Sequence, residues 1–292
     1  LHPVAHSFPT RRSSDLQSVF DASLPGIPHF LYTDHTHQEN LTYPGYDQTK
    51  YLGRKWIALE ESIYHNATRN FTMSHNIVES IIRDYRCAEE KVSCIYCGSN
   101  MEVSPDDTPA DDHIEKKNIL FVGVEWERKG GPYLAEAFRE TLKTHPDARL
   151  TIVGCNPSLD LPQCEIVGRV PLEEVKSYFK EATVFCMHTM IEPFGNVFLE
   201  AMALKVPVIG TRIGAIPDFI HEGKNGFLVD PGNIIQITEA LNRLLDSPQL
   251  CEKFGNYGYN LFWERYTWDH TGEHMKEEIM KAINQDHSSS PR

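Results

Sequence analysis

The feature that most constrains the fold is a regular alternation of short apolar runs and amphipathic stretches in the second half of the chain. Six runs are expected as strands, at 119–123, 149–154, 165–168, 183–188, 206–210 and 226–229. Helical patterns separate most of them, at 132–143, 172–179, 196–204 and 216–221, and three more follow, at 234–245, 248–263 and 269–284. Strands that alternate with helices pair in parallel through right-handed crossovers. The sequence therefore predicts an α/β domain built on a parallel sheet.

A shorter α/β stretch precedes this domain. Its strands are expected at 29–33, 70–74 and 91–96, and its helices at 55–64 and 76–85. Ser74 is expected to cap the second helix, because a serine hydroxyl can accept a hydrogen bond from the first turn. The Pro- and Asp-rich run at 104–112 lacks periodicity and is expected to be the linker. We predict a partial N-terminal domain, a C-terminal domain, and a C-terminal helix with its tail, at 17–111, 112–268 and 269–292.

The first 16 residues form a separate case. Residues 7–16 show no apolar periodicity and resemble the translation of a sequencing adapter. Residues 1–16 are therefore interpreted as artefactual or disordered, and the first domain is expected to lack its true N-terminus. They also lack the apolar region of a secretory signal.

The composition argues against some classes of partner. The chain has 292 residues and a formal net charge of −13, whereas proteins that bind nucleic acid by neutralising phosphates need a basic surface. No run approaches the roughly 18 apolar residues that span a bilayer. The seven cysteines are odd in number and irregularly spaced, which favours a reduced, cytoplasmic chain over a disulfide framework. Cys94 and Cys97 form a lone C-x-x-C pair, which we interpret as two ordinary thiols.

Open parallel sheets bind ligands outside the carboxyl ends of their strands, so candidate sites are sought where strands lead into helices. The first such junction of the C-terminal domain carries Arg128 and Lys129 between Gly123 and the pair Gly130-Gly131. Cationic side chains, glycines that allow close approach and the free N–H groups of a helix start together form an anion site. Taken alone, this pattern fits a solvated Arg-Lys pair about as well.

The strongest junction follows the strand expected at 183–188. Gly195 permits a tight turn, and a helix that begins at about Asn196 would point its first N–H groups towards an anion. Glu192 lies in the loop just before this helix, at the mouth of the crevice. Glu200 lies inside the helix, among Val, Phe, Leu, Ala and Met. A carboxylate there costs burial energy unless it is hydrogen-bonded, and sugar hydroxyls are suitable partners.

These residues carry a resemblance to a known family. The run EPFGNVFLEAMA at 192–203, which contains Glu192 and Glu200, resembles the E-x(7)-E motif of retaining glycosyltransferases with the GT-B fold, called glycosyltransferase group 1 or family 4. The resemblance continues at 206–209, 214–220 and 226–229, and extends back through 121–123 and 128–130. It covers about 118–268 with high specificity and 32–100 more weakly. It implies a GT-B-type α/β fold of two Rossmann-like domains with parallel sheets, the N-terminal one incomplete.

The resemblance implies a phosphate-binding role for the first junction. Lys129, with Arg128, would contact the diphosphate of the donor, and Gly123 and Gly130 would let that group approach the backbone. Many members of the family carry an arginine where this chain has Val124. One phosphate contact is therefore expected to be missing or to come from Arg128.

The resemblance also implies the sites for sugar and nucleoside. Glu192 would hold the transferred sugar and the distal phosphate, together with the N–H groups of Phe194, Gly195, Asn196 and Val197. Glu200 would bind the ribose hydroxyls. The base pocket would be lined by Gly168, Arg169 and Val170.

The reaction implied is transfer of a sugar from a nucleoside-diphosphate sugar to an acceptor hydroxyl, with retention of configuration. The partners would be the nucleotide-sugar donor and a carbohydrate or lipid-linked acceptor, and any peripheral membrane contact would use the N-terminal domain. The family needs no metal or cofactor, because cations and a helix N-terminus do the work of Mg²⁺. The cluster 106–112 is accordingly interpreted as linker. Asp34, His35 and His37 are candidates for an acceptor-side role.

Other interpretations stay open at this point. A phosphorylase or a nucleotide-sugar epimerase would share the architecture, although no lysine context for pyridoxal phosphate is evident. A nucleotide-sugar-binding fragment without transfer activity is a further alternative.

Overall fold

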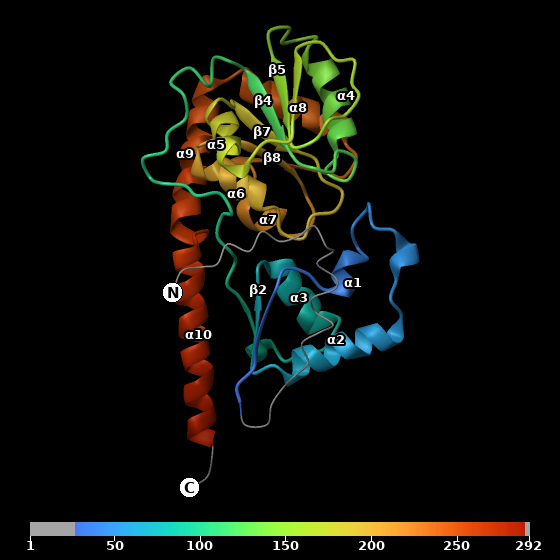
Figure 1. Ribbon diagram of the computed structural model, residues 1–292, viewed down its shortest axis with the longest axis vertical. Coiled ribbons are helices and arrows are strands. Elements are labelled where there is room, and N and C mark those ends of the chain that lie inside the picture. The colour runs from blue at the N-terminus through green and yellow to red at the C-terminus, as the bar shows by residue number, and fades with distance from the viewer. Residues whose placement is uncertain (1–26, 290–292) are drawn as a thin grey trace.

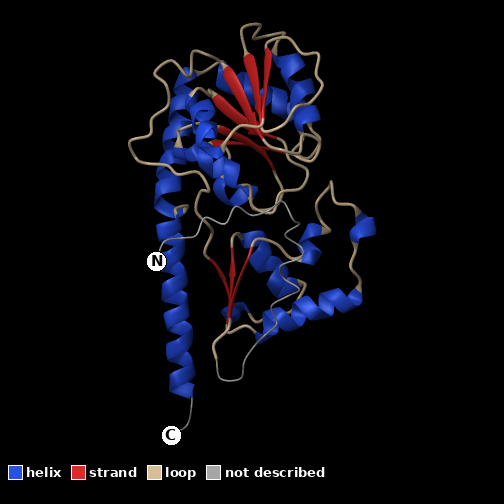
Figure 2. Ribbon diagram, viewed as in Figure 1, coloured by secondary structure: helices blue, strands red, loops and turns tan. Residues whose placement is uncertain are grey.

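The computed structural model of the protein describes residues 27–289, so the interpretation of residues 1–16 concerns a segment outside the described residues. Two α/β bodies follow one another along the long axis, and helix α10 (Trp268–Ser289) runs beside the smaller one (Figure 1). Each body is built on a sheet of its own (Figure 2). The predicted α/β fold with parallel sheets is confirmed. Within the described part of the chain, no helix is both long and apolar enough to cross a membrane.

The larger sheet has the strand order β6-β5-β4-β7-β8-β9, and every neighbouring pair is parallel. Its strands are β4 (Asn118–Val122), β5 (Arg149–Val153), β6 (Cys164–Gly168), β7 (Val184–Met187), β8 (Val208–Thr211) and β9 (Gly226–Val229). From β4 the chain runs outwards through β5 and β6, and it then returns to the other side of β4 with β7. The junctions after β4 and β7 therefore flank a topological switch point, where open α/β sheets bind ligands.

The helices of the larger domain lie close to the predicted ranges. They are α4 (Gly131–Thr141), α5 (Leu172–Lys180), α6 (Asn196–Ala203), α7 (Ile216–Phe219), α8 (Ile234–Leu245) and α9 (Pro248–Arg265). Helix α4 packs against α8, and α6 packs against α9. These pairs cover the sheet, as right-handed crossovers require.

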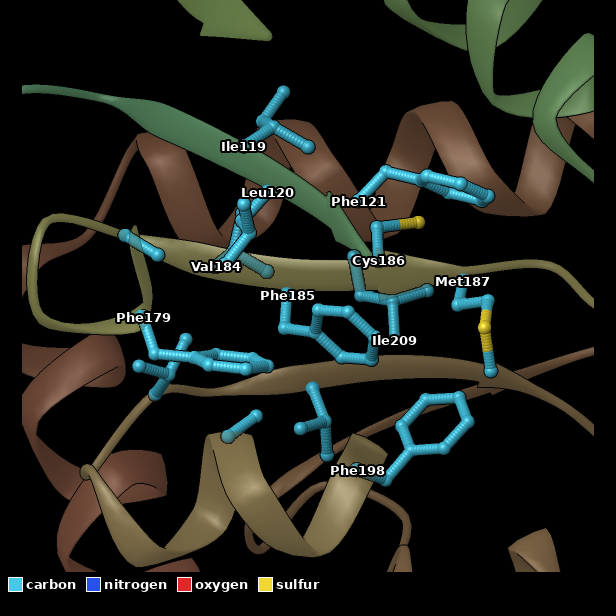
Figure 3. Packing of buried hydrophobic residues seen from close by; sticks show 14 of the residues in the cluster. Ile119, Leu120, Phe121, Phe179, Val184, Phe185, Cys186, Met187, Phe198 and Ile209 are labelled. Carbon is cyan, nitrogen blue, oxygen red and sulfur yellow. The ribbon is translucent and has the colours of Figure 1, made fainter. Parts of the chain in front are cut away.

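Strands and helices of the larger domain share one apolar core. All four side chains of β7 are buried, because the strand has neighbours on both sides and helices over its faces. The ring of Phe185 lies 5.6 Å from that of Phe179 and 5.1 Å from that of Phe198 (Figure 3). These aromatic contacts hold α5 and α6 against the sheet.

The smaller domain has three parallel strands in the order β1-β2-β3. Its elements are β1 (Phe30–Thr33), α1 (His37–Asn40), the 3-10 helix η3 (Gln48–Lys50), α2 (Arg54–Asn66), β2 (Arg69–Thr72), α3 (His75–Arg83), the 3-10 helix η4 (Glu89–Lys91) and β3 (Val92–Cys94). Its separate apolar core is small and consists of Tyr64, Ile77, Ile81, Tyr85, Cys87 and Val92. The short helices α1, η3 and η4 were not predicted, since none is long enough to display a helical period.

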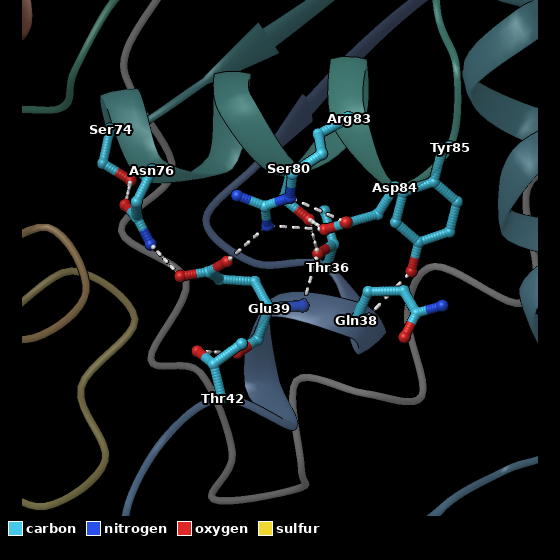
Figure 4. Close-up of polar contacts among 10 residues, drawn as sticks. All are labelled: Thr36, Gln38, Glu39, Thr42, Ser74, Asn76, Ser80, Arg83, Asp84 and Tyr85. Atoms are coloured by element: carbon cyan, nitrogen blue, oxygen red, sulfur yellow. Dashed lines mark hydrogen bonds and ion pairs between the residues drawn. The ribbon is translucent and has the colours of Figure 1, made fainter.

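The predicted cap of α3 is only half right. Ser74 occupies the N-cap position, but its side chain makes no capping hydrogen bond. Its Oγ donates to Asn76 Oδ1 at 2.6 Å instead, and Asn76 Nδ2 donates to Glu39 at 3.2 Å. The hydroxyl thus joins a polar network between α1 and α3 rather than satisfying the backbone of its own helix (Figure 4).

The run expected to be the linker lies against the larger domain. Asp107 pairs with Lys176 at 2.9 Å and with Lys180 at 2.8 Å, and both lysines belong to α5. The passage between the cores falls earlier, because Ile95 N–H bonds to β2 while Met101 is already buried in the larger core.

The C-terminal helix returns to the smaller domain. Glu278 on α10 pairs with Arg69 of β2 at 3.5 Å and accepts a hydrogen bond from Ser93 Oγ of β3 at 3.2 Å. At the start of α10, Trp268 Nε1 donates to Ser99 O at 2.9 Å. The second passage between the domains therefore packs directly against the first.

Candidate functional site

The carboxyl ends of three strands meet through glycines. Gly123 N, after β4, donates to Val153 O at 2.9 Å, and Gly154 N, after β5, donates to Gly168 O at 2.7 Å. A Cβ added at Gly154 would lie 2.7 Å from Gly123 O. The backbones converge where the sequence predicted the nucleotide, with no side chains between them.

Lys129 and Glu192 form an ion pair across the switch point, one from the junction after β4 and the other from the junction after β7. Their side chains are 14% and 8% exposed, so the pair is largely removed from water. Gly130 makes this approach feasible. Its φ is +71°, and an added Cβ would overlap the carbonyl of His188. A larger residue there would push the Lys129 loop away from the Glu192 loop.

Arg128 is held by the protein itself. Its guanidinium contacts Glu125 at 2.6 Å and donates to Ile191 O at 2.8 Å. In addition, Met190 N donates to Arg128 O at 3.0 Å. The predicted cationic pair therefore divides: Lys129 faces Glu192, whereas Arg128 ties the two loops together. Val124, beside Gly123, is exposed.

Helix α6 opens where predicted. Its N-cap is Gly195, with φ +93°, and the preceding Phe194 is buried against the ring of Phe219. The N–H groups of Asn196 and Val197 stand in the first turn, where an α-helix supplies no acceptor of its own. Free N–H groups at a helix start are the arrangement on which the expected anion site depends.

The Asn196 side chain has a partner that the sequence did not predict. Its Nδ2 donates to Gly98 O at 3.1 Å, and its Oδ1 accepts from Asn100 N at 3.1 Å. Both partners belong to the first passage between the domains. The start of α6 is therefore bonded directly to that passage, and no local sequence signal announces this pairing.

Glu200 is buried within α6, with 6% of the residue exposed. Burial raises the pKa of Glu200 to about 7, and the carboxyl makes no hydrogen bond within residues 27–289. A buried acid without a partner is costly and is therefore a candidate for binding a ligand. It can accept hydrogen bonds from a ligand that brings hydroxyl groups.

His188 is a further buried polar residue at this edge, and sequence reasoning missed it. Its Nε2 accepts from Gly232 N at 2.7 Å, and its Nδ1 lies 3.4 Å from Thr211 Oγ1. Burial lowers the pKa of His188 to about 4, so the ring is neutral. It links the end of β7 to the end of β8 and to the segment after β9. Its place at the end of a strand was the only signal in the sequence.

The residues predicted for the base pocket lie at the end of β6. Gly168 is buried with φ +81°, close to Asn156, while Arg169 is exposed and Val170 is half-buried. A cavity of about 290 Å³ lies elsewhere, between α4 and the loop after β5, and includes Trp126, Arg139 and Leu159 in its lining. It contains neither Lys129 nor Glu192.

The candidates of the smaller domain divide into a pair and a structural residue. His35 Nδ1 lies 2.6 Å from Asp34 Oδ1. Burial acts against both charges, but their hydrogen bond and mutual attraction outweigh it, so the pKa of Asp34 is lowered and that of His35 is raised. His37 instead accepts from Leu52 N at 3.2 Å and holds the loop after α1.

The two cysteines of the C-x-x-C pair have different neighbours. Cys97 Sγ accepts a weak bond from Asn196, whereas Cys94 lies with His75 and Asp218, their ligand-type atoms within 4.8 Å of one another. Burial raises the pKa of Cys94 to about 12, and His75 already contacts Asp218 and Tyr96. In this structure the cluster acts as a polar contact between the domains.

Comparison with known proteins identifies the larger domain. The sequence profile described as glycosyl transferases group 1 matches residues 107–261. An uncharacterized glycosyltransferase of Methanocaldococcus jannaschii is 28% identical over 233 residues, which are 73% of this chain and 60% of that protein. The D-inositol 3-phosphate glycosyltransferase of Corynebacterium diphtheriae is 27% identical over 222 residues, which are 67% of this chain and 52% of that protein.

The fold of a solved structure extends this likeness to the smaller domain. Sucrose-phosphate synthase from Thermosynechococcus elongatus superposes with a TM-score of 0.71 and 20% identity, over 88% of this chain and 68% of that one. The chain spans between half and two thirds of the length of the two curated relatives. The predicted GT-B architecture is confirmed.

Proposed function

The chain belongs to the family glycosyl transferases group 1, and from that membership we propose that it transfers a sugar from a nucleoside-diphosphate sugar to an acceptor hydroxyl, with retention of configuration. The observation that carries the proposal is the meeting of Lys129 and Glu192 across the switch point, beside the first turn of α6. Lys129 supplies positive charge and α6 supplies N–H groups, as a diphosphate requires. Glu192 supplies a carboxylate for sugar hydroxyls.

The chemical role of the larger domain is to bind the donor and to stabilise the departing diphosphate. Preorganised cations and N–H groups aimed at developing charge are among the strongest contributors to catalysis. Glu200 accepts hydrogen bonds from the ribose hydroxyls. Gly168 and Val170 border the base. No metal or cofactor is required in this proposal, because Lys129 and α6 occupy the position where a cation would otherwise neutralise phosphate. The acceptor is a carbohydrate or a lipid-linked molecule bound from the smaller domain.

In the structure, Lys129 pairs with Glu192. Binding of a diphosphate therefore requires Lys129 to share its charge or to change partner. The sugar then takes the place of Lys129 beside the Glu192 carboxylate. This exchange gives a role to an ion pair held in a largely buried place, where an unpaired charge would be costly.

The proposal predicts a selective loss of affinity on Lys129→Ala. Affinity for UDP or GDP should fall by about one to two orders of magnitude, on the scale of a charge-assisted hydrogen bond of roughly 1.5–3 kcal/mol. Affinity for uridine or guanosine should change little, because the nucleosides carry no phosphate. Calorimetric titration of the full chain measures both affinities. The control is Lys143→Ala, which removes an exposed lysine distant from the site. Equal losses for nucleoside and diphosphate would overturn the phosphate assignment.

Product analysis tests the reaction itself. Incubation of UDP-glucose or GDP-mannose with and without an acceptor separates transfer from epimerisation, and the anomeric configuration of the product, read by NMR, tests retention. Formation of an epimer in the absence of an acceptor would overturn the proposal of sugar transfer and show that the reaction is epimerisation.

A further inference from the structure

The loop after α1 extends from the smaller domain to the segment that carries Glu192. Gly45 N donates to Met190 O at 3.3 Å, and Tyr43, two residues earlier, is only 3% exposed. A Cβ added at Gly214 would lie 3.0 Å from the Tyr43 hydroxyl and would overlap the carbonyl of Glu192. The tip of the Tyr43 side chain therefore lies beside the Glu192 loop, on the side of the smaller domain.

The buried hydroxyl of Tyr43 has no hydrogen-bond partner among residues 27–289. The Asn76 side chain lies near it and acts to lower its pKa, but the contact falls short of hydrogen-bond geometry, while Asn76 donates one N–H to Glu39 and accepts from Ser74. Nearly all buried polar groups in native proteins have a partner, and exceptions call for an explanation. A ligand hydroxyl beside Glu192 would provide the missing partner.

The surroundings of Tyr43 restrict the chemistry of such a ligand. Burial, and then the charges of Glu39 and Glu192, raise the pKa of Tyr43, so the hydroxyl stays protonated and can both donate and accept. The same carboxylates repel a phosphate or a carboxylate. A neutral, hydroxyl-bearing group such as a sugar fits this environment.

A polar network fixes the element that carries Tyr43. Glu39, near the end of α1, is held by Asn76 and by Arg83 at 3.6 Å, both on α3. Thr36 Oγ1 lies 2.6 Å from Ser80 Oγ, also on α3 (Figure 4). The loop after α1 is thus anchored by contacts within the protein itself, as preorganised binding requires.

From this geometry we propose that Tyr43 is a sugar-specificity residue, whose hydroxyl hydrogen-bonds a hydroxyl of the transferred sugar beside Glu192. The inference rests on the proposed function, and it assigns to the smaller domain a contact with the donor as well as with the acceptor. Tyr43 is buried beside Glu192, whereas Tyr46 of the same loop only reaches Lys50 O at 3.5 Å.

The test is to compare Tyr43→Phe with Tyr46→Phe in the full chain. Calorimetry gives the affinities for UDP, UDP-glucose, GDP and GDP-mannose. The ratio of the affinity for a sugar nucleotide to the affinity for its diphosphate reports the contribution of the sugar to binding. In Tyr43→Phe this ratio should fall about fivefold, the scale of one neutral hydrogen bond, while diphosphate affinity is kept. Tyr46→Phe should keep the ratio of the parent. The Tm of unliganded Tyr43→Phe should equal or exceed that of the parent, because a hydroxyl without a partner is removed.

Three results would overturn the inference in different ways. If the parent binds no sugar nucleotide, the proposed function fails and Tyr43 fails with it. If the parent binds and Tyr43→Phe keeps the parent ratio, only the role of Tyr43 is overturned. If Tyr43→Phe lowers both the Tm and the diphosphate affinity, the hydroxyl is structural.

Discussion

In the larger domain, strands β7 and β8 bury every side chain, whereas in the smaller domain β3 buries only Val92. The larger sheet lies in one continuous apolar core, while the cluster beside the smaller sheet joins only six buried apolar residues. The smaller domain adds buried polar contacts instead, such as Glu60 with the Tyr85 hydroxyl and with His37 N. It also receives α10 from the far end of the sequence.

The difference separates two ways of holding a site in place. Apolar burial is non-directional and is shared among many contacts, whereas polar contacts are directional and fail when one partner is lost. The larger domain can therefore carry functional charges at its edge without endangering its fold. The smaller domain depends on specific partners, some of them distant in sequence.

The largest expected effect tests the apolar core of the larger domain. Phe185→Ala should destabilise the protein by about 4 kcal/mol, because a fully buried ring between Phe179 and Phe198 is replaced by a cavity. Urea unfolding measures the change. Phe30→Ala, on half-buried β1, should cost less than half as much. Equal losses of unfolding free energy at the two positions would show that the two domains do not differ in how much they depend on apolar burial.

The next effect concerns the acid buried in α6. Burial raises the pKa of Glu200 from its ordinary 4.5 to about 7. The folded state therefore keeps this proton between pH 4.5 and 7 while the unfolded chain loses it, so stability falls as the pH rises through that window. Glu200→Gln should remove this loss and stabilise the unliganded protein at pH 8 by about 3 kcal/mol, with little change near pH 4.5.

Unfolding by urea at several pH values, with exposed Glu174→Gln as the control, decides the point. The variant should also bind uridine or guanosine more weakly than the parent. If Glu200→Gln were less stable than the parent at pH 8, Glu200 would be a structural acid and the ribose role would be lost.

The smallest effect tests the packing of helix α10 against the smaller domain. Glu278→Ala removes the partner of Arg69 and Ser93, and should destabilise the smaller domain by about 1 kcal/mol, the scale of a partly exposed ion pair. Hydrogen exchange of the β2 and β3 amides reports this domain separately from the larger one. Glu277→Ala, on the exposed face of the same helix, is the matched control. Unchanged exchange in Glu278→Ala would mean that α10 does not support the smaller sheet.

The sequence predicted most of what depends on local pattern. The strands of the larger domain and the start of α6 at Asn196 follow from apolar periodicity and from Gly195, both of which act over a few residues. The same periodicity placed Glu192 and Lys129 at neighbouring strand ends, where the structure pairs them. Their roles towards a ligand stay predictions.

What could not be predicted depends on contacts between distant segments. Tyr43 lies in an irregular loop with no motif, and its place beside Gly214 results from the docking of two domains. Asn196 was assigned to an anion through its backbone, while its side chain bonds Gly98 and Asn100. Such pairings leave no trace in the local periodicity of the sequence.

The close packing of the two interdomain passages has a mechanical consequence. A Cβ at Gly98 would overlap Trp268, so the chain crosses between the domains twice within one narrow region. Two crossings packed against each other hold the domains together at one place, so relative motion of the domains is most restricted there. Asn196 bonds the first turn of α6 to the first of these crossings. The start of the helix therefore belongs to the region that a change in the angle between the domains would displace least.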